Sequence, residues 1–302
     1  MPANATCPIF AYEPVGSWQS IIPCMSSLSE LYAIFEKVFL CDSMIVLARM
    51  PQLCSEFVSA AIDLIRPVPY GGVRRPYLTM QSEFFLGPQD SGLPRHFLVG
   101  LTNPFILKRI ASATESSASP TPAVVYLKHS NRVPSLKSSK SHRRTSIPGD
   151  LDIPADSRTL AKCYLKSDHT FLNSIENFLK DPTPTNVDIG PLVRRHFAEL
   201  SAQILAPLNR YLTQHMSNDI FSPGGNLKYA NFSTADFLQS LSKHGTTVRF
   251  KGRNPLQRRK ARDAFYEAFC NSPNFYSWLD MKLTLEKEAA AGLLGENARE
   301  ET

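Results

Sequence analysis

The sequence of 302 residues lacks the patterns that mark membrane-spanning, secreted and disulfide-stabilised proteins. Glu36, Lys37 and Asp42 interrupt its most apolar stretch, so no segment reaches the roughly eighteen apolar residues of a transmembrane helix. The first residues do not show the basic and then apolar pattern of a secretory leader. Six cysteines occur without a Cys-x-x-Cys pair and without a histidine at ligand spacing. We therefore expect a soluble, cytoplasmic protein with reduced thiols, and neither a zinc site nor a disulfide framework.

Linear catalytic motifs are missing as well. The sequence has no Gly-x-Ser-x-Gly turn, no phosphate-binding glycine loop, no dinucleotide fingerprint, no His-Glu-x-x-His motif and no calcium loop. Glycine pairs at 71–72 and 224–225 indicate isolated turns, and the seven histidines are scattered. These absences predict no cofactor, no metal and no catalytic residue. Residues far apart in sequence can still assemble an active site, so the enzyme hypothesis is weakened and not removed.

Positive charge is scarce outside two short segments. Lysine and arginine number 33 against 27 acidic residues, a formal net charge of +6. The run 128–149 holds six basic residues and the run 249–262 holds seven, both without an acid, which leaves 20 basic against 27 acidic elsewhere. This imbalance argues against a nucleic-acid partner, which would require a broad basic surface. A solvated loop and a solvated helix face are the simplest reading of the two runs, and contact with anionic lipid or an acidic partner is the alternative.

The first basic run also contains specific candidate residues. We expect its contact with anionic lipid or an acidic partner to involve Lys137, Lys140, Arg143 and Arg144. Arg143 and Arg144 precede Thr145 and Ser146, an order that resembles a basophilic kinase site. Basic, serine-rich loops match that pattern by chance, so phosphorylation of Thr145 or Ser146 is left open.

The first half of the chain alternates helical and strand patterns. Ser27 to Glu30 matches a capping box, and the apolar stripe after it predicts a helix to about residue 39. Apolar spacing predicts a second helix over 54–65 and a short one reaching residue 110. Strands are expected at 44–48, 76–80, 96–101 and 123–128, the first of them central because it is apolar throughout. This alternation predicts an α/β fold with a central, mostly parallel sheet covered by helices.

The second half reads as an all-α subdomain. Apolar spacing predicts a helix over 189–216 with a kink at Pro207. Further helices are expected at 233–244, from Asn254-Pro255 and from Ser272-Pro273, with fraying after 287. Ser233 with Asp236 forms a capping box, and Phe232 with Phe237 a hydrophobic staple. The expected organisation is an extension at 1–26, the α/β core at 27–128, a basic serine-rich loop at 129–158, the helical part at 159–287 and a tail at 288–302.

A short motif, Asn103-Pro104-Phe105, follows the apolar strand at 96–101. It matches the tripeptide that EH domains of endocytic adaptors bind, but such ligands are normally exposed and flexible. Joining a buried strand to a helix, Phe105 is more simply a core anchor and Asn103-Pro104 a helix start. Adaptor binding is kept as the lesser alternative.

Several sequence blocks together resemble the DENN domain family, most closely the subfamily of DENN domain-containing protein 6. The resemblance covers about residues 15–282, and its blocks are Leu31 to Tyr77, Val99 to Phe105, Leu192 to Tyr211, Phe232 to Gly245 and Ser272 to Phe275 before Trp278. Each block alone is weak, and their common order makes the match specific. It also coincides with the division into an α/β part and a helical part.

The resemblance implies a guanine nucleotide exchange factor for Rab GTPases, acting in the cytoplasm and peripherally on endosomal membranes. Family members resemble one another in having an N-terminal longin-like lobe, an α/β core and a helical part, with the Rab held around the cleft between lobes. The sequence departs from this pattern, because about thirty residues precede the first core helix. The alternative is therefore a DENN-like scaffold or fragment that binds a Rab or a membrane without exchange. The oligomeric state is not predicted.

Candidate residues for the Rab interface come from position and charge. Thr102, Asn103 and Pro104 follow a sheet strand at its carboxyl end, where α/β folds place their ligands. Four arginines complete the set: Arg74, Arg75, Arg194 and Arg195. The competing interpretation is that Asn103-Pro104 only starts a helix and that the arginines are solvated or pair internally.

Overall fold

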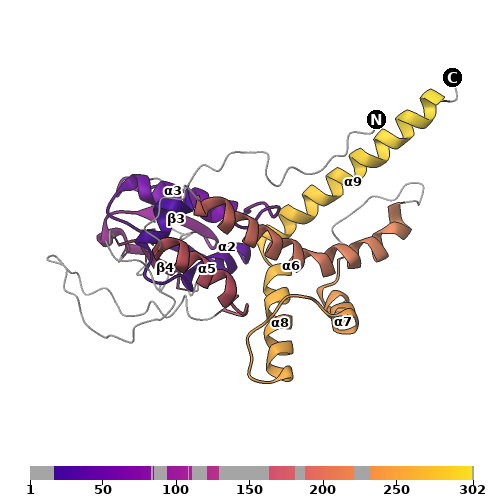
Figure 1. Ribbon diagram of the computed structural model, residues 1–302. Coiled ribbons are helices and arrows are strands. Elements are labelled where there is room, and N and C mark those ends of the chain that lie inside the picture. Colours follow the sequence, from indigo (N-terminus) through magenta and orange to yellow (C-terminus); the bar gives the residue numbers. More distant parts are fainter. Residues whose placement is uncertain are drawn as a thin grey trace.

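The computed structural model describes residues 17–82, 84, 94–107, 109–110, 121–128, 163–180, 188–220 and 232–300. Side chains are described in these ranges except at 215–220, 286–287 and 289–300. An α/β part built from residues 17–128 lies beside a set of longer helices from the second half of the chain (Figure 1). The α/β fold class with an all-α C-terminal part is thereby confirmed.

Four parallel strands form the sheet. They are β1 (Met44–Leu47), β2 (Val73–Arg75), β3 (Phe97–Leu101) and β4 (Ala123–Tyr126), in the order β2-β3-β1-β4. β1 is an inner strand, as its uniformly apolar sequence predicts, and pairs with β3 and β4. The prediction of a strand at 76–80 is wrong, because the edge strand comes earlier, at Val73–Arg75, where two of the three residues are arginines. An edge strand faces solvent, so it tolerates charged side chains that an apolar pattern search passes over.

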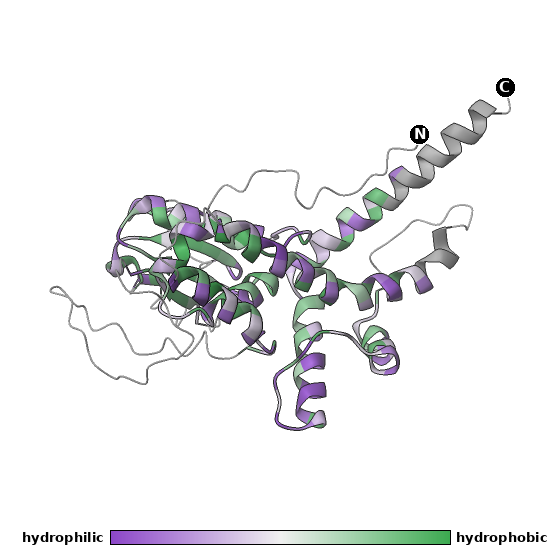
Figure 2. Cartoon of the chain, in the orientation of Figure 1, coloured by the Kyte–Doolittle hydropathy of each residue, from purple (hydrophilic) through white to green (hydrophobic). Residues whose placement is uncertain are grey.

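Two apolar clusters cover the two faces of the sheet. Met44 and Val46 of β1 face the larger cluster with the helices α2 (Glu30–Phe39) and α3 (Pro51–Asp63). Ile45, between them, faces the smaller cluster with Ile106 and Ile110 from the helical segment after β3. The alternation along β1 is the two-residue period of a strand buried on both faces. Figure 2 shows the apolar colouring concentrated in the sheet and on the inner sides of the helices.

The start of α2 differs from the predicted capping box. The helix begins at Glu30, and its N-cap residue Ser29 makes no side-chain capping bond. The Ser27 hydroxyl instead accepts a hydrogen bond from the Ser29 backbone N–H at 3.3 Å. The serines thus form a local turn before the helix, an alternative that short hydroxyl side chains commonly offer.

Among its described residues, the second part has five helices: α5 (His169–Lys180), α6 (Ile189–Ile220), α7 (Thr234–His244), α8 (Pro255–Cys270) and α9 (Pro273–Glu300). Two predicted N-caps are confirmed, because Ser233 accepts from the Asp236 N–H at 3.2 Å and Asn254 from the Gln257 N–H at 2.8 Å. Helix α6 continues through Pro207, and α9 extends to Glu300. Helix α5 was not predicted individually.

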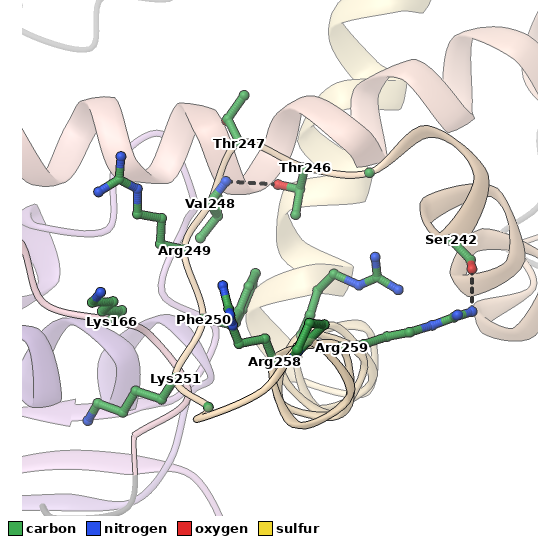
Figure 3. A pocket seen from close by; sticks show the side chains of 14 residues that line it. Lys166, Ser242, Thr246, Thr247, Val248, Arg249, Phe250, Lys251, Arg258 and Arg259 are labelled. Atoms are coloured by element: carbon green, nitrogen blue, oxygen red, sulfur yellow. Dashed lines mark hydrogen bonds between the residues drawn. The ribbon is translucent and has the colours of Figure 1, made fainter.

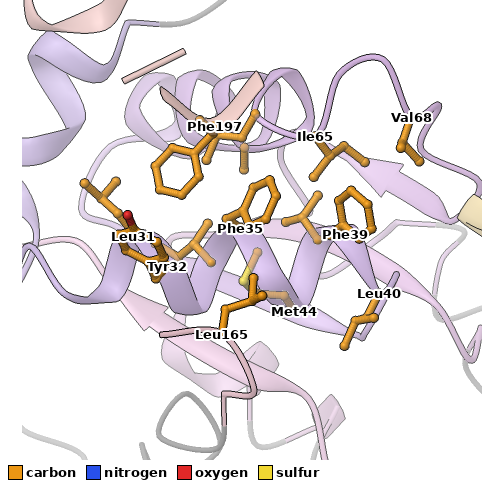
Figure 4. Close-up of a cluster of buried hydrophobic side chains, with 14 of the residues drawn as sticks. Leu31, Tyr32, Phe35, Phe39, Leu40, Met44, Ile65, Val68, Leu165 and Phe197 are labelled. Carbon is orange, nitrogen blue, oxygen red and sulfur yellow. The ribbon is translucent and has the colours of Figure 1, made fainter. Parts of the chain in front are cut away.

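Aromatic side chains join the two parts into one core. Phe35 of α2 stacks on Phe197 of α6 with ring centroids 5.0 Å apart. Phe39, one turn later, lies 4.6 Å from Phe269 and 6.0 Å from Phe265 of α8. Figure 4 shows Phe35 and Phe39 on successive turns of α2, with Phe197 above them. Helix α2 therefore contributes to both the sheet layer and the helical layer.

A buried carboxylate fixes the segment that precedes α5. Glu36 is 1% exposed and accepts hydrogen bonds from the backbone N–H groups of Tyr164 at 2.9 Å and Leu165 at 2.8 Å. Burial raises the pKa of Glu36, and these hydrogen bonds oppose that rise. Leu165 then pairs with Phe250 in an isolated antiparallel bridge. Glu36 thus ties the α/β part to the segment that bridges to the loop between α7 and α8.

The segment expected to be an N-terminal extension contributes to the core. Trp18 and Ile21 of helix α1 (Trp18–Ile21), and Ile22 of the following 3-10 turn (Ile22–Cys24), are buried. The five described cysteines are free thiols, as predicted. Within the described ranges, no helix has the length and apolarity needed to cross a bilayer. The candidate residues of the basic serine-rich loop lie outside the described residues: Lys137, Lys140, Arg143, Arg144, Thr145 and Ser146.

Candidate partner-binding surface

The parallel sheet brings several separate turns to one edge. Because all four strands run in the same direction, their carboxyl ends share an edge, which is where ligands of open α/β sheets bind. Leu47 pairs with Leu101, and the Ala48 N–H donates to the Leu101 carbonyl at 3.0 Å. The Leu78 N–H donates to the Gly100 carbonyl at 2.8 Å. We call the residues of these turns the carboxyl-edge surface: Met50, Tyr77, Thr102, Asn103, Pro104 and Phe105.

The turn after β3 is an ordered helix start. The Asn103 side-chain oxygen accepts a hydrogen bond from the Phe105 N–H at 2.9 Å, and Pro104 is the first helical residue. This is the N-cap geometry that Asn and Pro favour. The prediction that Asn103-Pro104 begins a helix is confirmed.

The prediction that Phe105 is a core anchor is wrong. Its side chain is 59% exposed, whereas Ile106 and Ile110 are buried. Ile106 and Ile110 are four residues apart and share one helix face, which places Phe105 about 100° away from that face. The spacing of the two isoleucines was the signal that could have shown this. A large exposed aromatic ring beside a helix start is available to a partner.

Further apolar side chains are exposed in the same turns. Met50, which precedes α3, is 52% exposed, and Tyr77, which follows β2, is 38% exposed. The Tyr77 hydroxyl lies 3.1 Å from the Thr102 hydroxyl, so the turns after β2 and β3 are joined at the surface. Met50 and Tyr77 were not predicted as site residues. Without the sheet register, the sequence does not show that their turns lie at the same edge of the sheet, and apolar residues are then most simply assigned to the core.

Close backbone packing supports this edge from behind. A Cβ on Gly100 would lie 2.2 Å from the Pro76 carbonyl oxygen and 2.7 Å from Cys54 Cβ, so only glycine fits there. The Cys54 thiol donates to the Leu101 carbonyl at 3.1 Å. The carboxyl-edge surface therefore rests on a rigid layer, which lowers the entropic cost of binding.

Arg74 and Arg75 lie on the edge strand β2. Both are exposed, and they pair in register with Leu98 and Val99 of β3. Arg75 Nη1 donates to the Arg74 carbonyl at 3.3 Å. These two arginines flank the carboxyl-edge surface along the strand that leads to Tyr77.

The other two candidate arginines are placed elsewhere. Arg194 of α6 forms a largely buried ion pair with Asp63, the last residue of α3. The Nε of Arg66 also lies 2.7 Å from an oxygen of the Asp63 carboxylate. Because α3 has 13 residues, Asp63 lies about 20 Å from the end of the helix near Met50. Arg195 points outward, 75% exposed, and pairs with Glu199 at 3.0 Å. The structure thus brings Thr102, Asn103 and Pro104 together and separates them from Arg194 and Arg195.

One histidine has an unusual environment without a site around it. His196 Nε2 lies 2.6 Å from the Tyr32 hydroxyl, and the Phe171 ring stacks on the imidazole at 3.7 Å. Burial lowers the pKa of His196 and raises that of Tyr32 to about 12. This packing between α2, α5 and α6 is that of a core histidine. No group of three potential metal ligands occurs among the residues that the structure describes.

Comparison with known proteins supplies the relationship that geometry alone cannot. The chain is 27% identical to chicken protein DENND6A and to human protein DENND6B, and the alignments cover 87% and 86% of this chain. A DENND6 homolog of Dictyostelium discoideum is 25% identical over 87% of the chain. The chain is a relative of the DENND6 proteins. No protein-family model matches it.

The relationship covers nearly all of the chain and a minor share of the relatives. The aligned regions span 44% of chicken DENND6A, 43% of human DENND6B and 39% of the Dictyostelium homolog. This DENND6-related chain therefore corresponds to less than half of each of those proteins. The resemblance to the DENN domain-containing protein 6 subfamily, predicted from the sequence blocks, is confirmed.

Proposed function

We propose that the chain is a guanine nucleotide exchange factor for a Rab-family GTPase, active in the cytoplasm and at endosomal membranes. The relationship to DENND6 proteins carries the proposal, because Rab exchange is the activity that the DENN resemblance implies. The carboxyl-edge surface, flanked by Arg74 and Arg75, is proposed as part of the area that contacts the GTPase. Its exposed aromatic groups and flanking arginines are of the types that concentrate binding energy at protein interfaces.

Exchange is a binding problem, with no covalent bond made or broken. When a small GTPase binds nucleotide with nanomolar to picomolar affinity, the binding free energy is about 12 to 16 kcal/mol. An exchange factor competes by binding the nucleotide-free conformation more tightly than the GDP-bound one. Such a complex needs roughly 1,600 Å² of interface with a few well-packed anchors. In this proposal Phe105 and Tyr77 are two of the anchors.

A second candidate function is Rab binding without exchange. The likeness to DENND6 proteins covers 44% or less of their length, so it implies nothing that needs their remaining residues. A chain that binds GDP-loaded and nucleotide-free Rab equally would be a scaffold, because equal affinity cannot shift the nucleotide equilibrium.

Release of fluorescent GDP from a panel of Rab GTPases tests the proposal. The intact chain should accelerate release from at least one Rab, and Phe105→Ala should reduce that acceleration about tenfold or more. Tyr276→Ala is the matched control, because this α9 aromatic is similarly exposed, at 52%, and lies outside the carboxyl-edge surface. Acceleration of no Rab would refute exchange. Equal loss in both variants would refute the role of the carboxyl-edge surface.

A further inference from the structure

A concave, strongly basic pocket lies in the helical part, away from the carboxyl-edge surface. The loop between α7 and α8 and the first turns of α8 line an open cavity of about 910 Å³ (Figure 3). Six of the lining residues are basic: Lys166, Arg249, Lys251, Arg258, Arg259 and Arg262. We call this cavity the α8 pocket. Lys166 comes from the segment before α5, so the pocket is assembled from parts of the chain that are distant in sequence.

The charge of the α8 pocket is mostly uncompensated. None of its lining residues is acidic. Asp263 lies 3.9 Å from Arg259 and 2.6 Å from Arg262, so one carboxylate serves two arginines. Within the described part of the chain, the other four basic lining residues have no carboxylate at ion-pair distance. Clustered like charges repel one another, so this arrangement favours binding of an anion.

Backbone contacts hold the loop that carries these cations. The Lys166 N–H donates to the Arg249 carbonyl at 2.9 Å, and the Lys251 N–H donates to the Tyr164 carbonyl at 2.7 Å. Gly252 has φ +155°, and a Cβ there would lie 2.6 Å from the Arg258 backbone nitrogen. The loop is therefore packed directly against the start of α8. Because the backbone of the pocket is fixed by these contacts, binding would have to order the basic side chains and not the loop.

The shape and chemistry of the pocket point to a compact ligand with several phosphates. Its volume is within the range of about 300 to 1,000 Å³ that is common for small-molecule sites, whereas protein partners use flatter surfaces. Guanidinium groups match phosphate oxygens in two-pronged hydrogen bonds, and lysines add point charges. Thr246 and Thr247 also line the cavity, and the Thr246 hydroxyl accepts a hydrogen bond from the Val248 backbone N–H at 3.2 Å.

A nucleotide fits the lining less well. Phe250 is the pocket's aromatic residue, but it is 5% exposed and lies 5.7 Å from Phe265 and 6.1 Å from Tyr266. Its ring is occupied by the core and offers no free face on which a base could stack. We propose that the α8 pocket binds a multiply phosphorylated inositol ring, carried by a phosphoinositide or free as an inositol polyphosphate. This inference does not depend on the proposed exchange activity.

Calorimetric titration of the intact chain with inositol hexakisphosphate tests the site. One molecule should bind per chain at near-physiological ionic strength. The double variant Arg249→Gln/Arg258→Gln should weaken binding about tenfold or more, because each arginine supplies a charge-assisted contact. The control Arg74→Gln/Arg195→Gln removes the same charge at exposed positions and should change affinity less than about threefold. Circular dichroism should show that both variants fold.

Vesicle sedimentation then identifies the source of the phosphorylated ring. Vesicles with phosphatidylinositol bisphosphate are compared with phosphatidylserine vesicles of equal surface charge. Preference for the phosphoinositide, competed by inositol hexakisphosphate, supports the lipid source. If the chain binds inositol hexakisphosphate in the titration but shows no preference among the vesicles, the soluble source is supported.

Absence of inositol hexakisphosphate binding, or an equal loss of affinity in the two double variants, would overturn the proposal. A third outcome would also overturn the proposal: no inositol hexakisphosphate binds, and Arg249→Gln/Arg258→Gln loses Rab binding. That result would assign the pocket to an acidic protein partner.

Discussion

The α/β part and the helical part expose opposite kinds of surface. The α/β part buries its inner strands β1 and β3 on both faces and exposes apolar side chains at the carboxyl edge of the sheet, Phe105 above all. The helical part buries most of its aromatic residues, with Phe178 and Tyr276 as exposed exceptions, and exposes basic side chains around a cavity. A rigid apolar edge suits a protein partner, and a concave basic pocket suits a small anion. Under the two proposals, the two parts would offer separate binding sites on one shared core.

The largest expected effect tests whether that core is really shared. Phe39→Ala removes a ring that lies against Phe265 and Phe269 of α8, so we expect a loss of about 3 to 5 kcal/mol of unfolding free energy. Urea unfolding should remain a single transition when followed by tryptophan fluorescence, which reports Trp18 and Trp278 in the two parts, and by circular dichroism. Two separate transitions, with only one displaced, would show that the parts fold independently.

A pair of neighbouring arginines sharpens the comparison at the boundary between the parts. Arg194→Gln breaks a buried ion pair between α6 and α3, and we expect it to cost about 2 kcal/mol because Arg66 still contacts Asp63. Arg195→Gln breaks an exposed pair and should cost less than about 0.5 kcal/mol. Urea unfolding of the two variants, side by side, measures the difference. Equal costs would contradict the assignment of Arg194 as a structural link.

The smallest expected effect is a pH dependence at the start of α2. Burial raises the pKa of Glu30 from 4.5 to about 7, so the folded state binds the proton more tightly than the unfolded state. The stability from this group is present below pH 4.5 and is lost as pH rises to about 7. Between pH 4.5 and about 7, the unfolding free energy of the wild-type protein should fall by about 1 kcal/mol relative to that of Glu30→Gln. The fall is smaller than the whole pKa shift would give, because Glu30 is partly exposed to solvent.

Urea unfolding at several pH values measures that loss. Glu267→Gln, at an exposed position of α8, is the control for removal of one carboxylate and should keep the wild-type profile. A Glu30→Gln variant with the same pH profile as the wild-type protein would contradict the raised pKa.

Local sequence signals predicted most of the elements. Ser233 with Asp236, and Asn254 before Pro255, fixed two helix starts, because capping depends on residues a few positions apart. The apolar run of β1 predicted an inner strand, because a strand that is buried on both faces has apolar residues throughout. The α/β and helical division followed from these periods.

Features that depend on distant contacts were not predictable. Strand β2 is an exposed edge strand whose pairing with β3 has no apolar signature. The exposure of Phe105 follows from which helix face Ile106 and Ile110 bury. Lys166 joins the α8 pocket through backbone hydrogen bonds between residues 164–166 and 249–251. Arg194 and Arg195 are adjacent in sequence, yet one is buried against Asp63 and the other is exposed. Identity and charge alone carry no information about such pairings.

The affinity of the intact chain for nucleotide-free and GDP-loaded Rab GTPases tests the central claim most directly. An exchange factor must bind the nucleotide-free form more tightly, and we expect a ratio of about 100 or more for at least one Rab. Biolayer interferometry on a Rab panel, with nucleotide removed or GDP in excess, measures both affinities. Equal affinities, or no binding to any Rab, would contradict the account.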